Sequence, residues 1–68
     1  MQKFGLKIWR LNAGLTQKEL AKQMGKSNKT ISKWEKGESF PTSKDIDKLC
    51  EILKVSYDNI NFLHNDSL

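Results

Sequence analysis

Residues 28–36 carry polar and basic side chains at spacings that would gather them on one face of a helix. Ile31 and Trp34, three residues apart, would face the core. The opposite face would then present Asn28, Lys29, Ser32, Lys33 and Lys36. Asn can pair with N6 and N7 of adenine, and Lys can donate to guanine or to phosphate. A solvated face normally mixes both signs of charge, whereas this one has three cations and no acid, which is typical of nucleic-acid binding.

The sequence has few residues that could form a disulfide, a metal site or a catalytic site. Cys50 and His64 are the single cysteine and the single histidine. One cysteine cannot form an internal disulfide, and one cysteine with one histidine cannot fill a standard zinc site. No Ser/His/Asp or Cys/His set has three usable members. We therefore expect no enzymatic activity, no cofactor, no metal and no small-molecule substrate, and we expect Cys50 to be a small core residue.

Length and charge are consistent with a small DNA-binding domain. The chain has 68 residues, enough for one domain, and a net charge of +4. Residues 1–44 hold ten basic and three acidic residues, a net +7, whereas residues 45–68 hold two basic and five acidic, a net −3. This asymmetry indicates one surface that faces a polyanion. Without long apolar runs a membrane span is excluded, and the N-terminal residues lack a signal-peptide core, so we expect a cytoplasmic protein.

Helix-ending and helix-starting residues divide the chain into five short helices, and no period-two alternation indicates a strand. The predicted fold is all-α, with helices at about 3–13, 17–24, 28–36, 43–53 and 57–63 in a domain over 1–63, followed by a flexible tail over 64–68. Gly14, Gly25 and Gly37 would end the first three helices. Thr16 and Glu19 would form a capping box, Ser27 would cap the third helix, and Thr42 or Ser43 the fourth.

The second and third helices are separated only by Gly25, Lys26 and Ser27. So short a turn forces a steep crossing, and the small Ala21 permits close approach at the crossing point. This arrangement is typical of a helix-turn-helix, in which the second helix enters the major groove of DNA.

Several segments together resemble the XRE-type, lambda-repressor-like helix-turn-helix family. They are Leu15-Thr16-Gln17-Lys18-Glu19-Leu20-Ala21, Met24-Gly25-Lys26-Ser27, Thr30-Ile31-Ser32-Lys33-Trp34-Glu35-Lys36-Gly37 and Pro41. The resemblance covers about 6–63 and implies a five-helix domain that binds operator DNA, usually as a two-fold dimer. With the face described above, it leads us to expect base reading by Asn28, Lys29, Ser32 and Lys33. It leads us to expect contacts with the DNA backbone by Thr16, Gln17, Ser27, Lys36 and Lys44.

The resemblance also pairs Arg10 with Glu35, as a bridge from the first helix to the end of the third. Arg10 is the only arginine among twelve basic residues, and bidentate pairing with a carboxylate is a task that lysine performs poorly. The alternative is that Arg10 is an ordinary surface cation. Three positions depart from the family pattern. Lys26 stands where the family usually has a buried Val or Ile, Lys54 where relatives often carry a helix-ending Gly, and Ser43 where a Leu is common.

A second apolar stripe, formed by Phe4, Ile8 and Leu11, lies where relatives carry polar residues. It would either pack under the C-terminal segment, against Phe62 or Leu63, or remain exposed as a surface for a protein partner.

Two functions follow from these observations. The first is a sequence-specific transcriptional regulator of double-stranded DNA, a small Cro-type phage or plasmid switch that dimerises weakly through Ile60, Phe62 and Leu63. The alternative is an antirepressor that forms a heterocomplex with a repressor protein and blocks its DNA-binding surface.

Overall fold

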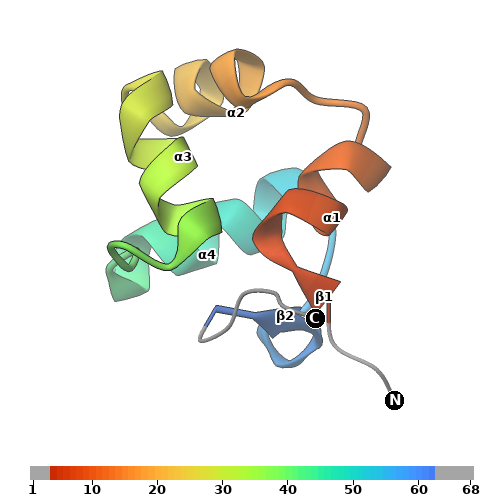
Figure 1. Cartoon of the computed structure of the whole chain (residues 1–68). Helices are drawn as coiled ribbons and strands as arrows, with labels where there is room; N and C mark the ends of the chain where they lie inside the picture. The colour runs from red at the N-terminus through yellow and green to blue at the C-terminus, as the bar shows by residue number, and fades with distance from the viewer. Residues whose placement is uncertain (1–3, 63–68) are drawn as a thin grey trace.

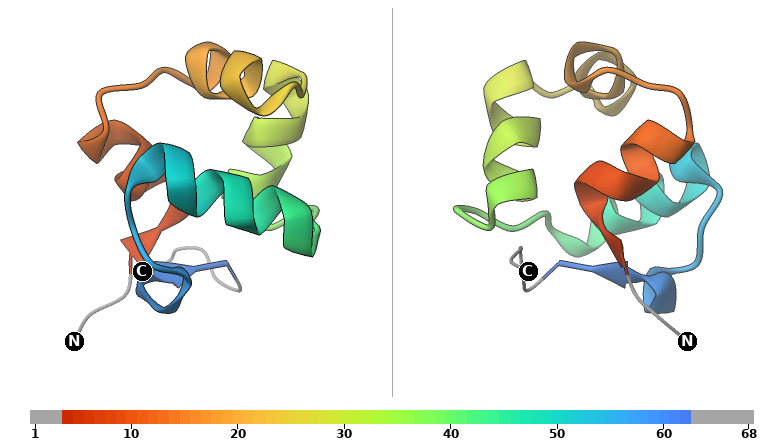
Figure 2. Two further views of the ribbon diagram at one scale, coloured as in Figure 1. Left: turned by 180° about the vertical axis from the view of Figure 1, so that it is seen from behind. Right: turned by 45° about the vertical axis from the view of Figure 1, so that its right-hand side comes forward.

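The computed structural model describes residues 4–62, which form a small helical domain closed by a short sheet. The elements are β1 (Phe4–Gly5), α1 (Leu6–Asn12), α2 (Gln17–Met24), α3 (Asn28–Lys36), α4 (Ser43–Leu53), the 3₁₀ helix η1 (Tyr57–Asn59) and β2 (Ile60–Asn61). In Figures 1 and 2, α2 crosses one end of α3 steeply, and α3 forms an outer edge of the molecule. No helix within 4–62 has the length and apolar character required to cross a membrane.

The bounds of α2, α3 and α4 agree with the predicted 17–24, 28–36 and 43–53, because local signals define their ends. In α2, the Thr16 hydroxyl accepts the backbone N–H of Glu19 at 3.0 Å, and the Glu19 carboxylate accepts that of Thr16 at 2.8 Å. This is the predicted capping box. Ser27 caps α3 by accepting the backbone N–H of Thr30 at 3.1 Å. Such caps contribute about 1 kcal/mol each.

The cap of α4 is Thr42, the first of the two residues proposed for it. Its hydroxyl accepts the backbone N–H of Asp45 at 3.2 Å, and Asp45 in turn accepts the backbone N–H of Thr42 at 3.1 Å. α4 ends on Lys54, which has φ 57° and ψ 48°. Lys54 is the one residue other than glycine within 4–62 with a positive φ. A side chain in this left-handed conformation is strained, whereas the glycine that the family resemblance leads us to expect there would adopt it freely.

The two ends of the fold differ from the prediction. The first helix begins at Leu6 instead of residue 3, because Phe4 and Gly5 pair in parallel with Ile60 and Asn61. The predicted fifth helix over 57–63 is wrong: η1 covers only three residues, and β2 follows it. The described residues therefore contain four α-helices, not five. Leu63 and the predicted tail over 64–68 lie outside the described residues.

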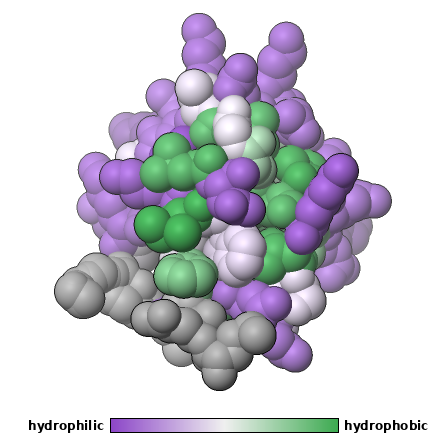
Figure 3. All heavy atoms as spheres, turned by 90° about the vertical axis from the view of Figure 1, so that its right-hand side faces the viewer, coloured by the Kyte–Doolittle hydropathy of each residue, from purple (hydrophilic) through white to green (hydrophobic). Residues whose placement is uncertain are grey.

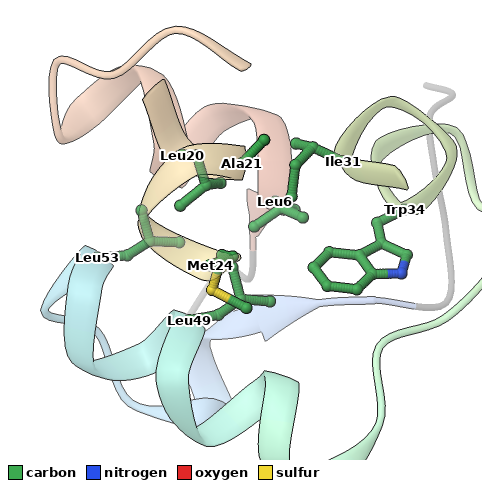
Figure 4. Packing of buried hydrophobic residues seen from close by; sticks show 8 residues of the cluster. All are labelled: Leu6, Leu20, Ala21, Met24, Ile31, Trp34, Leu49 and Leu53. Atoms are coloured by element: carbon green, nitrogen blue, oxygen red, sulfur yellow. The ribbon is translucent and has the colours of Figure 1, made fainter. Parts of the chain in front are cut away.

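The core lies between the four helices, as Figure 4 shows. Its buried members come from α1 (Leu6), α2 (Leu20, Ala21, Met24), α3 (Ile31, Trp34) and α4 (Leu49, Leu53). Leu20, Ile31 and Leu49 are fully buried, and each such side chain contributes about 1.5–3 kcal/mol. Because α3 supplies two of these residues, one face of α3 is fixed against the core and its other face must point outward.

Candidate nucleic-acid interface

The outward face of α3 contains the residues expected to read bases. Asn28, Lys29, Lys33 and Lys36 are exposed, whereas Ser32 is half-buried. The buried Ile31 and Trp34 lie on the opposite face, as predicted, so the direction of this polar face is set by core packing. Ser32 is a short side chain at a half-covered position, and its reach toward a ligand is accordingly smaller than that of the lysines.

The one acid of α3, Glu35, does not reduce the positive charge of this face, because it points inward. Arg10 of α1 donates through Nε to Glu35 Oε2 at 2.6 Å and through Nη2 to Oε1 at 3.4 Å. The side chains of Arg10 and Glu35 are only 7% and 5% exposed. The pair expected from the sequence is therefore present and buried, and the alternative of Arg10 as a surface cation is wrong. Arg10 Nη1 also donates to the carbonyl oxygen of Leu15 at 2.7 Å.

The residues expected to contact the DNA backbone are placed at helix starts and ends. Thr16 and Gln17 lie at the beginning of α2, Ser27 caps α3, and Lys36 is its last residue. Thr16, Ser27 and Lys36 are exposed, and Gln17 is half-buried. The Ser27 hydroxyl also lies 3.0 Å from that of Thr30. The hydroxyls of Thr16 and Ser27 thus act as helix caps. A phosphate near these residues would instead meet the positively polarised N-terminus of a helix.

Lys44 and Lys26 are both near the beginning of α4. Lys44 is exposed in the first turn of that helix. Lys26 Nζ, in the turn between α2 and α3, lies 3.5 Å from Asp45 Oδ1. Burial acts to raise the pKa of Asp45, but hydrogen bonds with Thr42 and the nearby Lys26 ammonium outweigh it and hold that pKa below its ordinary value. Asp45 is therefore ionised at neutral pH and offsets part of the local positive charge.

Two further side chains are structural. Trp9 packs against the core, and its Nε1 donates to the carbonyl oxygen of Asn59 at 2.9 Å, which ties α1 to the C-terminal segment. Cys50 is half-buried on α4 and is not among the residues of the core, so the expectation of a core cysteine is not confirmed. Burial and the nearby negative charge of Asp47 raise the pKa of the Cys50 thiol, so it stays protonated and unreactive at neutral pH.

The residues predicted to contact protein partners divide into two groups. Phe4, Ile8 and Leu11 are exposed by 41%, 48% and 54%. Figure 3 shows one face of the molecule, on which hydrophobic side chains, drawn in green, reach the surface. Ile60 is only 3% exposed, because β2 pairs with β1, so its assignment to a partner surface is wrong. Phe62 is half-buried and packs against the core. Leu63 lies outside the described residues.

An apolar pocket near η1 was not predicted from the sequence. It has a volume of about 250 Å³ and is lined by Phe40, Pro41, Ile46, Tyr57, Ile60, Asn61 and Phe62. Phe40 and Tyr57 are each more than half exposed at its rim. Tyr57 stacks on Phe62 with ring centroids 6.1 Å apart. The pocket depends on η1 and β2, whose positions the sequence did not reveal, although a phenylalanine in a loop is an unusual placement that could have signalled it.

Comparison with known proteins agrees with this geometry. A helix-turn-helix family model matches residues 6–60. A curated relative, the HTH-type transcriptional regulator DicA of Escherichia coli K12, is 40% identical over 47 residues. That match covers 69% of this chain but 35% of the relative, so the chain corresponds to about a third of that protein. No solved structure matches significantly. The family model spans α1 to the start of β2, and the chain therefore belongs to the XRE-type helix-turn-helix family.

Proposed function

We propose that the protein is a sequence-specific, DNA-binding transcriptional regulator of the repressor-like Cro type, which places α3 in the major groove. The observation that carries the proposal is the exposed face of α3. It presents three lysines and an asparagine, while the only acid of the helix is buried against Arg10. Similarity to DicA, an HTH-type transcriptional regulator, supports the same function.

Each expected contact has a chemical basis. Asn28 and Lys29 lie in the first turn of α3, the part of a recognition helix that usually reaches base edges. Asn28 would donate to and accept from adenine, and Lys29 and Lys33 would donate to guanine O6 and N7 or to phosphates. Ser32 would act only at short range. Thr16, Gln17, Ser27, Lys36 and Lys44 would contact the backbone, which fixes the register of the protein on DNA.

A weak homodimer is part of the proposal, and the pocket beside η1 supplies a surface for it. Phe40 and Tyr57 leave apolar area exposed at the rim of a pocket that a second copy could fill. Phe40 follows the end of α3 by only a few residues, so a two-fold contact there would pair two recognition helices. Two such helices would read half-sites about 10 base pairs apart.

Selection from a random duplex pool tests the function. The purified protein is incubated with the pool, and bound duplexes are recovered and amplified. The most enriched duplex is then titrated with the protein at several salt concentrations. We expect enrichment of one motif with two-fold symmetry, and a log–log salt slope of several units because lysines displace counterions. Binding that is weak and unselective at every salt concentration would overturn the proposal.

The exposed stripe of Phe4, Ile8 and Leu11 favours a second candidate, an antirepressor that binds a repressor protein. None of residues 4–62 covers this apolar area. An exposed apolar patch often marks a surface that a protein partner buries. In this function the protein would form a one-to-one complex with a repressor from the same cell and release it from DNA.

Paired substitutions on α1 separate the two candidates. Ile8→Lys would abolish release of the repressor from its duplex, whereas Ala13→Lys, which adds the same charge at an exposed position off the helix face that carries the stripe, would not. Both variants would keep direct DNA binding. If Ile8→Lys and Ala13→Lys release the repressor equally well, the stripe is not the contact surface.

A further inference from the structure

Four side-chain and backbone groups meet between α1, α2 and α3. Arg10 donates to Leu15 O at 2.7 Å and to Glu35 Oε2 at 2.6 Å, and Gln17 Nε2 donates to Glu35 Oε1 at 3.0 Å. Gln17 is the first residue of α2 and Leu15 lies just before it. The buried pair thus reaches the beginning of α2 through a backbone carbonyl and through a side chain.

The hydrogen bond to Glu35 fixes the orientation of the Gln17 amide. An ionised carboxylate only accepts hydrogen bonds, so the amide nitrogen, and not its oxygen, must face Glu35. That nitrogen carries two N–H groups, and the contact with Glu35 uses one. The second N–H stays available as a donor, and a phosphate oxygen is an acceptor for it.

The position of Gln17 suits such a contact. When the second helix of a helix-turn-helix lies in the major groove, the first crosses the DNA backbone. Gln17, at the start of α2 and half-buried, then lies between the Arg10–Glu35 pair and the DNA.

We propose that Glu35, held by Arg10, is a positioning residue that orients the Gln17 side chain to donate to one DNA phosphate. The inference rests on the proposed function and deepens it, since it adds a role in DNA binding to a buried ion pair. Ordering a glutamine side chain has a substantial entropic cost, and a side chain already held in the free protein avoids that cost when DNA binds. Arg10 also balances the charge of Glu35, which would otherwise repel a nearby phosphate.

A double-mutant cycle on DNA affinity tests the proposal, with the duplex recovered by selection as the probe. One arm is Gln17→Met, which keeps length but removes both donors. The other arm is Arg10→Met combined with Glu35→Met, which removes both charges together, because an apolar replacement of a buried pair is often tolerated. Dissociation constants are measured for the wild type, each arm and the combination, with melting temperatures recorded in parallel.

We expect the Arg10→Met/Glu35→Met arm to weaken DNA binding about threefold to tenfold when Gln17 is present, the loss expected for one hydrogen bond. In the Gln17→Met background, the same arm should weaken binding no further. An equal loss in both backgrounds would show that the ion pair acts only by holding the fold, and no loss with Gln17 present would show that it has no role in binding. Either result overturns the proposal.

Glu35→Asp repeats the cycle with a smaller perturbation. It keeps the negative charge beside Arg10 but withdraws the carboxylate from Gln17 by one methylene, and we expect the same dependence on Gln17. A wild-type protein that binds no duplex selectively would instead contradict the proposed function, so the two failures are distinguishable.

Discussion

Lys26 Nζ lies 3.5 Å from Asp45 Oδ1, so an ion pair joins the turn of the helix-turn-helix to the first turn of α4. The family resemblance leads us to expect a buried Val or Ile at this turn position. In this chain the lysine instead extends to the surface, with its side chain 38% exposed. Partly exposed pairs of this kind contribute about 1 kcal/mol, so the contact orients the turn more than it stabilises the fold.

Acid should weaken this part of the structure. Because the pKa of Asp45 is lowered in the folded protein, ionised Asp45 stabilises the fold above its ordinary pKa of 3.8, and this contribution is lost as the pH falls through the folded value. We expect the stability difference between the wild type and Asp45→Asn to shrink as the pH is lowered from about 5 to about 2.5. Urea unfolding at each pH measures it, with Asp47→Asn as the control for removal of an exposed carboxylate. A difference that stays constant with pH contradicts the assignment.

The Arg10–Glu35 pair should show the asymmetry of buried charges. Arg10→Met leaves Glu35 buried without an opposite charge, and we expect it to lower the free energy of unfolding by about 3–5 kcal/mol. Arg10→Met/Glu35→Met removes both charges, and we expect its stability to lie within about 1–2 kcal/mol of the wild type. Denaturant unfolding followed by tryptophan fluorescence gives both values. If the double variant is no more stable than Arg10→Met, an uncompensated charge is not the cause.

Lys54 offers a stabilising substitution. Because it ends α4 with φ 57°, Lys54→Gly would relieve the strain of a side chain in the left-handed region. We expect a gain of about 0.5–1 kcal/mol, since the greater freedom of glycine in the unfolded chain offsets part of the benefit. Lys48→Gly, in the interior of the same helix, is the matched control and should lose about 1 kcal/mol. Thermal unfolding of both variants measures the effect, and destabilisation by Lys54→Gly is the contrary result.

Much of the fold was predictable because its signals are local. Thr16 with Glu19, Ser27, and the glycines after each helix define α2 and α3 within a few residues of sequence. The sheet was not predictable, because strands of two residues have no detectable alternation and Phe4 meets Ile60 across nearly the whole chain. The same reason explains the error at Ile60, which an assumed fifth helix would have left on the surface.

For the candidate site, the periodicity of Ile31 and Trp34 was sufficient to identify which side chains of α3 point outward. The hydrogen bond between Gln17 and Glu35 was not predictable, since it requires the relative placement of α2 and α3 with Arg10 between them. The capping box of Thr42 and Asp45 could have been predicted from the sequence, because the two residues have the spacing that such a box requires.

Removal of positive charge from α3 should weaken DNA binding without destabilising the fold. We expect Lys29→Ala with Lys33→Ala to weaken binding to the selected duplex at least tenfold, and to reduce the salt slope by about two units if both lysines contact phosphates. Both side chains are exposed, so the melting temperature should change little. Lys48→Ala, on α4, is the control for loss of a surface charge. Unchanged affinity in the double variant contradicts the assignment of this face.

The most direct measurement is an NMR titration of the ¹⁵N-labelled protein with the selected duplex. The proposed function predicts that backbone amide shifts concentrate at the start of α2 and along α3, from Ser27 to Lys36. Residues of the α1 stripe, such as Ile8 and Leu11, should remain unperturbed. Shifts that concentrate on α1 while α3 stays unchanged would contradict the claim that α3 is the DNA-binding helix.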